Sequence, residues 1–314
     1  MALNVRKPNS RKKGLKILVY GETGTGKTLF ALSFPKVLAM DSEDGYAWYE
    51  GTDKAKNLIG IVDSQSYDDL EELLDQLEDG ELDFETLVID SETKIYENIQ
   101  EALLSVEERR AINKGRDPLD ANISQRGWGK IKQLATRLQN AKIRMASQGF
   151  NVVSVAQNKD LTQDIGNGTR VKTGETADMA KKAPYDYDIV LHLQIKDGKY
   201  IGVVEKDRTT TYKAGDVIEN PSYKNWEKRL QAKDNQGETV VKDYNKDVDK
   251  SKEAYQNEVK STMTFPERVK EYLGSLSSVE KKAFAEKLVE VTGTNKIKEM
   301  NKEQQKAVLA LMNK

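Results

Sequence analysis

Apolar and polar positions along the first two thirds of the chain predict strands and helices in alternation. Short, nearly continuous apolar runs, which are typical of strands buried in a parallel sheet, alternate with segments whose apolar residues recur at helical spacing. The predicted strands are residues 15–20, 36–41, 58–62, 84–90, 150–157, 187–194 and 200–207. This order favours an α/β fold, a mainly parallel twisted sheet flanked by helices, with ligands bound at the carboxyl ends of the strands.

The segments between the strands divide into helices and polar stretches. Amphipathic helices are predicted at residues 68–78, 91–104 and 127–147. Residues 105–127 and 158–184 are polar and show no sustained period, so we expect two mobile loops there. The Asp197-Gly198 pair between the last two strands predicts a hairpin turn.

Composition along the chain predicts four parts. A basic arm at residues 1–13 precedes an α/β core at residues 14–230; this terminus could contact nucleic acid or remain solvated. Residues 231–260 are almost wholly polar and are expected to form a linker. Apolar residues return with helical spacing from Phe265, which predicts a small helical C-terminal module at residues 261–314.

Composition also excludes several kinds of site. The chain has no cysteine and one histidine, His192, which excludes disulfides, thiolate metal sites, cysteine nucleophiles and His-rich zinc sites. Between Arg126 and Arg144 there are six basic residues and no acidic one, which predicts a cationic strip on that helix. No apolar run approaches the ~18 residues of a membrane span, so we expect a soluble, cytoplasmic protein without membrane contact.

The strongest chemical signal directly follows the first predicted strand. The spacing G-x-x-x-x-G-K-[ST] of a Walker A phosphate loop is met by Gly21, Glu22, Thr23, Gly24, Thr25, Gly26, Lys27 and Thr28. Small residues let backbone N–H groups converge on phosphate oxygens at the start of the following helix. Lys27 is expected to contact the β- and γ-phosphates, and the Thr28 hydroxyl to ligate Mg²⁺. A strand-to-helix turn without a ligand is the alternative interpretation.

Acidic residues at strand ends supply the expected metal and catalytic groups. Asp90 closes the strand at 84–90 and is the predicted second residue of the Mg²⁺ site. Many AAA+ ATPases place a catalytic Glu directly after this Asp, where this chain has Ser91, so the base must come from elsewhere. Glu43 is the best candidate to orient or deprotonate the attacking water, with Glu92 as the alternative base. The alternative interpretation is that Glu43 belongs to a polar turn and has no catalytic role.

Further polar residues are candidates for sensing the nucleotide. Gln157 closes the next strand and could hydrogen-bond both the γ-phosphate and the loop that follows, so that loss of this phosphate releases the loop. Lys206 and Arg208 lie two apart on the last strand, so both cations point to one side and could reach the nucleotide of an adjacent subunit. The alternatives are that Gln157 only caps the end of its strand and that Lys206 and Arg208 form a charged strand end in water. The stretch 158–160 lacks the spacer of the guanine-reading N-K-x-D motif, which favours ATP over GTP.

Taken in order, these motifs resemble the RecA core: the loop at 21–28, a strand followed by Glu43, LVID-Ser with Asp90, and SVAQ ending in Gln157. Over about residues 14–220 the sequence is most similar to bacteriophage RecA-like P-loop ATPases of the Sak single-strand-annealing type. The resemblance implies that the two polar loops at 105–127 and 158–184 bind DNA. It also implies that the K-x-R pair, Lys206 and Arg208, acts between subunits, as in DnaB-type helicases and KaiC. It also implies homo-oligomers in rings or filaments, a single-stranded-DNA-binding protein as partner, and the host cytoplasm as location if the protein is phage-encoded.

The resulting hypothesis is an ATPase, stimulated by DNA, that binds single-stranded DNA and supports phage DNA recombination and annealing. Apart from Trp128 and Tyr185 beside them, the two loops lack aromatic residues for base stacking, so DNA contact would depend on charge. Two alternatives use the same residues. One is a hexameric helicase-like motor, and the other is a regulatory ATP-dependent assembly that does not bind DNA and uses the C-terminal module to dock a partner.

Overall fold

A computed structural model of the protein describes residues 11–78, 82–234, 238–239 and 244–312. The chain forms two compact units, Met1–Lys242 and Asp243–Lys314. Most of the expected basic arm, residues 1–10, lies outside the described residues. The arm ends in strand β1 (Arg11–Lys12), which pairs in parallel with β11 (Glu238–Thr239).

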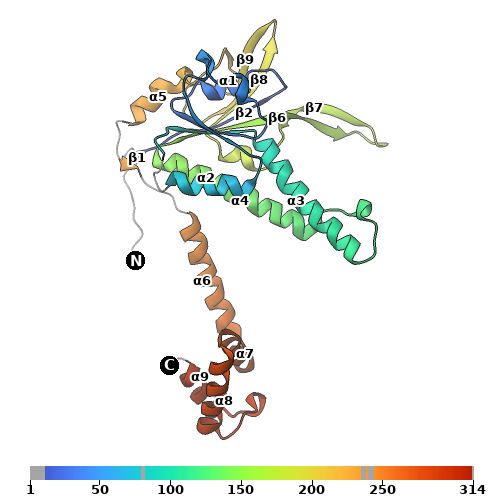
Figure 1. Ribbon diagram of the computed structural model, residues 1–314, viewed down its shortest axis with the longest axis vertical. Coiled ribbons are helices and arrows are strands. Elements are labelled where there is room, and N and C mark those ends of the chain that lie inside the picture. Colours follow the sequence, from blue (N-terminus) through green and yellow to red (C-terminus); the bar gives the residue numbers. More distant parts are fainter. Residues whose placement is uncertain (1–10, 79–81, 235–237, 240–243, 313–314) are drawn as a thin grey trace. The chain divides into compact units, whose positions relative to one another are not determined.

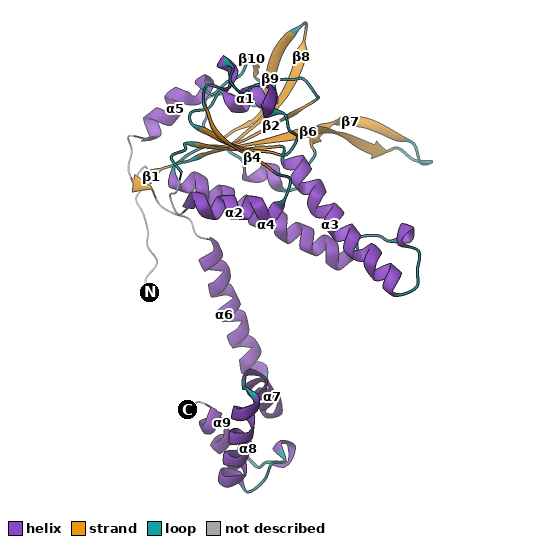
Figure 2. Cartoon of the chain, in the orientation of Figure 1, coloured by secondary structure: helices purple, strands orange, loops and turns teal. Residues whose placement is uncertain are grey.

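The first unit is built on a large sheet whose strand order is β10-β9-β8-β2-β6-β5-β3-β4, with β7 paired to β6 (Figures 1 and 2). Strands β8, β2, β6, β5, β3 and β4 run parallel to one another, while β7, β9 and β10 are antiparallel to their neighbours. The strands are β2 (Lys16–Gly21), β3 (Val37–Asp41), β4 (Leu58–Asp63), β5 (Thr86–Asp90), β6 (Asn151–Asp164), β7 (Arg170–Ala177), β8 (Ile189–Lys196), β9 (Lys199–Asp207) and β10 (Val217–Glu219). The predicted fold class, a mainly parallel sheet flanked by helices, is confirmed.

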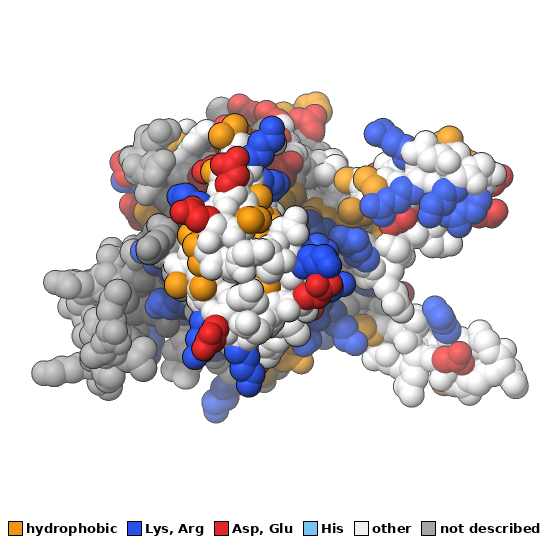
Figure 3. Space-filling view, turned by 90° about the horizontal axis from the view of Figure 1, so that it is seen from below, with side chains coloured by type: hydrophobic (Ala, Val, Ile, Leu, Met, Phe, Trp, Pro, Cys, Tyr) orange, Lys and Arg blue, Asp and Glu red, His pale blue; other side chains and the backbone are white. Residues whose placement is uncertain are grey.

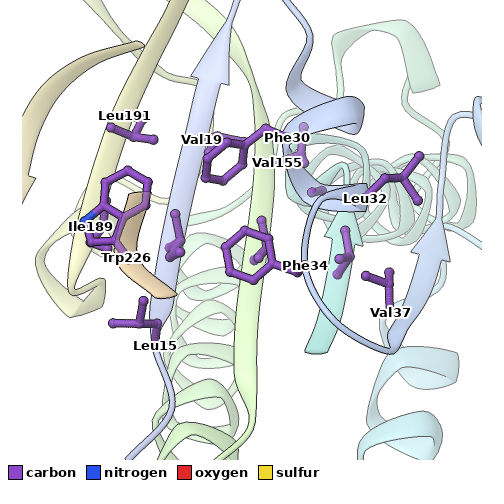
Figure 4. Close-up of a cluster of buried hydrophobic side chains, with 14 of the residues drawn as sticks. Leu15, Val19, Phe30, Leu32, Phe34, Val37, Val155, Ile189, Leu191 and Trp226 are labelled. Carbon is purple, nitrogen blue, oxygen red and sulfur yellow. The ribbon is translucent and has the colours of Figure 1, made fainter. Parts of the chain in front are cut away.

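Helices cover both faces of this sheet (Figure 2). One face carries α1 (Lys27–Leu32) and α5 (Lys224–Asp234), and the other carries α2 (Tyr67–Glu78), α3 (Glu92–Asn113) and α4 (Gln125–Gln148). Successive strand residues point to opposite faces, so Ala39 packs in the first layer and Met40 in the second. Phe30, Phe34 and the fully buried Trp226 lie against the strands in the first layer (Figure 4). This packing fixes α1, and with it the loop that precedes α1.

Helix α3 is longer than the sequence predicts. It continues to Asn113, so the first part of the expected mobile loop at 105–127 is helical, and α4 already begins at Gln125. Figure 1 shows this part of α3 projecting with α4 beyond the sheet. A helix that projects into solvent needs few apolar residues, so no helical periodicity of apolar positions marks it in the sequence. Its polar residues pair with one another instead, as Glu107 does with Arg110 at 2.9 Å.

The expected mobile loop at 158–184 is largely a β-hairpin. Strand β6 continues past Gln157, and β7 returns beside it (Figure 1). Main-chain hydrogen bonds build such a ladder, so it does not need the apolar pattern from which strands are predicted. The turn has positive φ at Gly166, Asn167 and Gly168 (103°, 52° and 73°). This Gly-Asn-Gly sequence is the turn signal that the sequence interpretation missed.

The second unit is helical, and the predicted C-terminal helices are confirmed. Its helices are α6 (Tyr244–Thr262), α7 (Phe265–Ser275), α8 (Ser278–Thr292) and α9 (Lys302–Met312), and a small core is formed by Val269, Phe284, Leu288, Met300 and Val308. Most of the described part of the expected linker at 231–260 is helical, in α5 and α6. Its Lys, Glu, Gln and Ala residues have good helix propensity, so polarity alone does not indicate irregular backbone. No helix in the described parts of the chain is long and apolar enough to cross a membrane.

Candidate active site

The loop between β2 and α1 has the backbone that a phosphate cradle requires. At Gly21 a Cβ atom would lie 2.2 Å from the carbonyl oxygen of Leu193 in β8, so a residue with a side chain is excluded. Gly24 and Gly26 have φ of 79° and 87°, which glycine adopts without strain. The Thr25 hydroxyl donates to the Glu22 carbonyl at 2.8 Å and fixes the loop from within. The sequence therefore builds a rigid loop whose backbone can approach a ligand closely.

Lys27 and Thr28 place a cation and a hydroxyl at the start of α1. Lys27 Nζ donates to the carbonyl oxygens of Gly21 (2.9 Å) and Glu22 (2.8 Å), and so lies over the loop. Burial lowers the pKa of Lys27, while the negative charges of Asp90, Glu43 and Glu22 act in the opposite direction. Thr28 Oγ1 donates to Asp90 Oδ2 at 2.8 Å, which links α1 to the end of β5.

Asp90 is a buried carboxyl group in an acidic environment. Burial raises its pKa to about 6; the hydrogen bond from Thr28 lowers it, and Glu43 and Asp41 raise it further. A cation at this position would offset the charge of the three carboxylates. A hydroxyl and a carboxylate beside a phosphate site are also the protein oxygens that Mg²⁺ uses when phosphates and water complete its coordination. The residues therefore fit a magnesium ion, although the described residues contain no group of three or more His, Cys, Asp or Glu arranged to bind a metal.

Glu43 is held by a turn at the end of β3. Asp41 Oδ1 accepts from the backbone N–H of Glu43 at 3.0 Å, and Asp41 Oδ2 accepts from that of Tyr46 at 2.8 Å. Ser42 fastens the turn to β5, because its N–H donates to the Asp90 carbonyl (2.7 Å) and its hydroxyl accepts from the Ser91 N–H (2.7 Å). Glu43 is thus an exposed carboxylate on a rigid turn.

Two side chains donate to one oxygen of Glu43. Oε1 accepts from Ser91 Oγ at 2.6 Å and from Gln157 Nε2 at 2.8 Å. The strand register explains the meeting, because Gly21 lies opposite Gln157 and Asp90 opposite Asp41 at the carboxyl ends of neighbouring strands. The structure therefore brings Lys27, Thr28, Asp90, Glu43 and Gln157 together beside one loop, while their predicted chemical roles stay predictions.

Lys206 and Arg208 are not part of this cluster. Lys206 Nζ and Arg208 Nη2 both donate to the carbonyl oxygen of Tyr185, at 2.9 and 3.0 Å, so the two cations do point to one side. Lys206 pairs with Val190 near the start of β8, whereas the phosphate loop lies beside Leu193 further along that strand. Within one chain the pair therefore lies towards the other end of β8 from the loop.

Glu92, the alternative base, is buried in a different layer. Its carboxylate accepts from Gln139 Nε2 (2.8 Å) and the Tyr187 hydroxyl (2.7 Å) and forms an ion pair with Lys142. Removing one partner of a buried ion pair typically costs about 3–5 kcal/mol, so this cluster has a structural role in joining α3, α4 and Tyr187, which directly follows the 3-10 helix at Ala183–Asp186. The interpretation of Glu92 as a base is wrong, because its oxygens are occupied away from the phosphate loop.

The same cluster changes the expected cationic strip on α4. Lys142 is fully buried, and Arg144 is only partly exposed, so four of the six basic residues remain on the outside. These exposed residues are Arg126, Lys130, Lys132 and Arg137. Trp128 on the same helix is 47% exposed. On the face visible in Figure 3, Lys and Arg side chains are interspersed with Asp and Glu.

Comparison with known proteins gives a family match. The sequence profile of a family described as AAA domain matches residues 13–218, more than half of the chain. A search of curated proteins found no match. Among solved structures, the RadB recombinase is similar at 19% sequence identity and a TM-score of 0.42, over 67% of this chain and 87% of the RadB chain.

Proposed function

Because the chain belongs to the family described as AAA domain, we propose that it binds and hydrolyses ATP with Mg²⁺ and couples this reaction to binding of single-stranded DNA. The observation that carries the proposal is the single cluster in which Lys27, Thr28, Asp90, Glu43 and Gln157 meet beside the loop. This set contains a phosphate-binding cation, a site for magnesium, a base for water and a neutral amide for sensing, which phosphoryl transfer to water requires.

Each residue has a separate task in this proposal. Lys27 leaves the Gly21 and Glu22 carbonyls to contact the phosphates, and Thr28 with Asp90 holds the metal site. Mg²⁺, when bound, offsets the charge on the phosphate oxygens. Glu43 accepts a proton from the attacking water, because its carboxylate is exposed and lies beside the loop. Gln157 senses the γ-phosphate, since its amide lies beside Glu43 and at the root of the β6–β7 hairpin.

The proposed DNA contacts are two projecting parts of the first unit, the β6–β7 hairpin and the end of the α3–α4 pair, together with the exposed cations of α4. The β6–β7 hairpin carries exposed Lys159, Arg170 and Lys172, and α4 carries its exposed cations. Because the hairpin also carries Asp160, Asp164 and Glu175, the net positive charge that suits a flexible, negatively charged strand lies on α4, which has no acidic residue. Within this proposal the protein supports phage DNA recombination and annealing, beside a single-stranded-DNA-binding protein. The test is steady-state ATP hydrolysis with and without a single-stranded oligonucleotide across a salt series, where stimulation that weakens as salt rises is expected.

Neutralising the exposed α4 cations should weaken DNA binding in a salt-dependent way. For the triple variant Arg126→Ala, Lys130→Ala, Lys132→Ala, the slope of log affinity against log salt should fall by about 2, since each phosphate contact on a single strand contributes about 0.7. Fluorescence anisotropy with a labelled oligonucleotide measures this. The matched control removes three exposed lysines from α8, Lys281, Lys282 and Lys287, and should leave the slope unchanged. Equal slopes for the two triple variants would assign DNA binding to another surface.

Lys206 and Arg208 are proposed to act on the nucleotide of a neighbouring copy. Lys27→Ala protomers keep the cation pair, and protomers with Lys206→Ala and Arg208→Ala keep the loop, so each alone should be inactive. In an equimolar mixture about a quarter of the sites combine an intact loop with an intact neighbouring pair, and that share of activity should return. Hydrolysis in the mixture is compared with the sum of the separate variants. Activity no greater than this sum would exclude action between copies.

A further inference from the structure

The root of the β6–β7 hairpin is closed by a side chain from α3. Asn158 pairs with Ala177 at the last position of the hairpin ladder, and Gln157 and Asp178 lie next to this pair towards the sheet. On one side of these two residues, Asp178 N–H donates directly to the Gln157 carbonyl at 2.9 Å. On the other side, the Thr93 hydroxyl accepts from Gln157 N–H at 2.9 Å and donates to the Asp178 carbonyl at 2.7 Å. The hydroxyl thus stands between the donor and acceptor that a regular antiparallel pair would join directly.

The position of Thr93 connects this root to the nucleotide cluster. Thr93 is 1% exposed and lies in the first turn of α3, directly after Asp90, Ser91 and Glu92. Ser91 in the same turn donates to the Glu43 oxygen that also accepts the Gln157 side chain. One helical turn therefore holds Gln157 twice, by its amide through Ser91 and Glu43 and by its backbone through Thr93. A shift of Gln157 must move or break the Thr93 hydrogen bonds.

A hydroxyl is suited to this position for a chemical reason. It can accept and donate at the same time, so one atom satisfies a buried N–H and a buried carbonyl. In a helix a Thr hydroxyl commonly bonds to a carbonyl of its own preceding turn, but here it bonds to the two strands of the hairpin. The second tie at the root, Lys159 Nζ to Asp178 Oδ1 at 3.0 Å, joins an exposed lysine to a partly exposed carboxylate and is correspondingly weaker.

We propose that Thr93 is a positioning residue that transmits the state of the nucleotide site to the β6–β7 hairpin. The proposal rests on the proposed function, because the signal begins with a nucleotide in the loop at 21–28. Contact between the γ-phosphate and the Gln157 amide changes the Gln157–Glu43 bond, the backbone of Gln157 follows, and the Thr93 hydroxyl carries the shift to Asp178. The hairpin is then ordered or released as a unit, since both of its strands are held at this point.

Hydrogen exchange of the full chain, measured by mass spectrometry, tests this relay with Mg²⁺ and a slowly hydrolysed ATP analogue. In the unaltered protein the analogue should change exchange of the hairpin amides at 158–177 by about two- to tenfold, the range that one hydrogen bond contributes to local opening. Thr93→Val keeps the shape but removes the hydroxyl, and the nucleotide-dependent change in the hairpin should fall to less than about twofold. Thr93→Ser retains the hydroxyl and should restore it. Protection at residues 21–28 should be the same in all three proteins.

A hairpin response in Thr93→Val equal to that of the unaltered protein would overturn the relay. If Thr93→Val does not fold, the unaltered protein and Thr93→Ser decide the matter. A hairpin response in both supports the relay, and no response in the unaltered protein despite protection at 21–28 overturns it. Absence of that protection in the unaltered protein is a different result, because it removes nucleotide binding and with it both the proposed function and the relay. Since no DNA is present, failure of DNA binding alone leaves this test intact.

Discussion

Replacing Lys27 by alanine is expected to lower kcat/KM for ATP hydrolysis by about 10²–10³-fold or more, the effect of removing one preorganised donor from a charged transition state. Lys27 is the cation placed over the phosphate loop, and burial lowers its pKa, so its ammonium is poorly hydrated and available to phosphate oxygens. Binding of a fluorescent ATP analogue should weaken as well, because the contact to the β- and γ-phosphates is lost in the ground state too. Phosphate release and analogue titration measure the two effects separately.

The control for Lys27 is Lys56→Ala, which removes an exposed lysine of the same unit that follows the short 3-10 helix at Asp53–Ala55. Its hydrolysis rate should stay within about twofold of the unaltered protein, as expected for a surface substitution away from the site. A Lys27 variant that keeps more than a tenth of the activity would show that the loop is not the catalytic phosphate site, whatever its sequence spacing.

The phosphate loop could be predicted from sequence because its geometry is local. Gly21, Gly24 and Gly26 are required by close approach and positive φ within a few residues, and Lys27 follows at a fixed spacing. Asp90 could be predicted for a related reason. Parallel strands bring their carboxyl ends to the same edge, so an acid at the end of an apolar run lies near the loop without any knowledge of strand order.

Other features depend on contacts between distant segments and leave no local signal. Lys142 belongs by spacing to an exposed cationic strip, yet it is buried because Glu92, fifty positions earlier, provides its partner. Likewise Thr93 is an ordinary polar residue near a helix start, and its role becomes visible only when Gln157 and Asp178 are placed beside it. At the hairpin, the polar sequence predicted a mobile loop where the structure has regular strands. Main-chain hydrogen bonds rather than apolar side chains hold β7 in place there.

Replacing Glu43 by glutamine is expected to lower kcat by about 10²–10⁴-fold, the contribution typical of a general base, while ATP binding changes little. Glutamine keeps an oxygen that can accept from Ser91 and Gln157, so the hydrogen-bonded cluster and the turn held by Asp41 should persist. What it removes is the capacity to take a proton from water. The expected pattern is therefore a loss in kcat with an unchanged dissociation constant for the nucleotide, in contrast to Lys27→Ala.

The matched control is Asp44→Asn, which makes the same chemical change one residue further along the turn. Asp44 is exposed and has φ of 55°, a conformation that asparagine tolerates, so this variant removes one negative charge without disturbing the backbone. If loss of charge near the loop were sufficient, both variants would be impaired. If Glu43 acts on water, only Glu43→Gln is impaired, because the position of the carboxylate beside Ser91 and Gln157, and not the charge of the turn, determines the rate. Equal kcat values for the two variants would place the base on another residue.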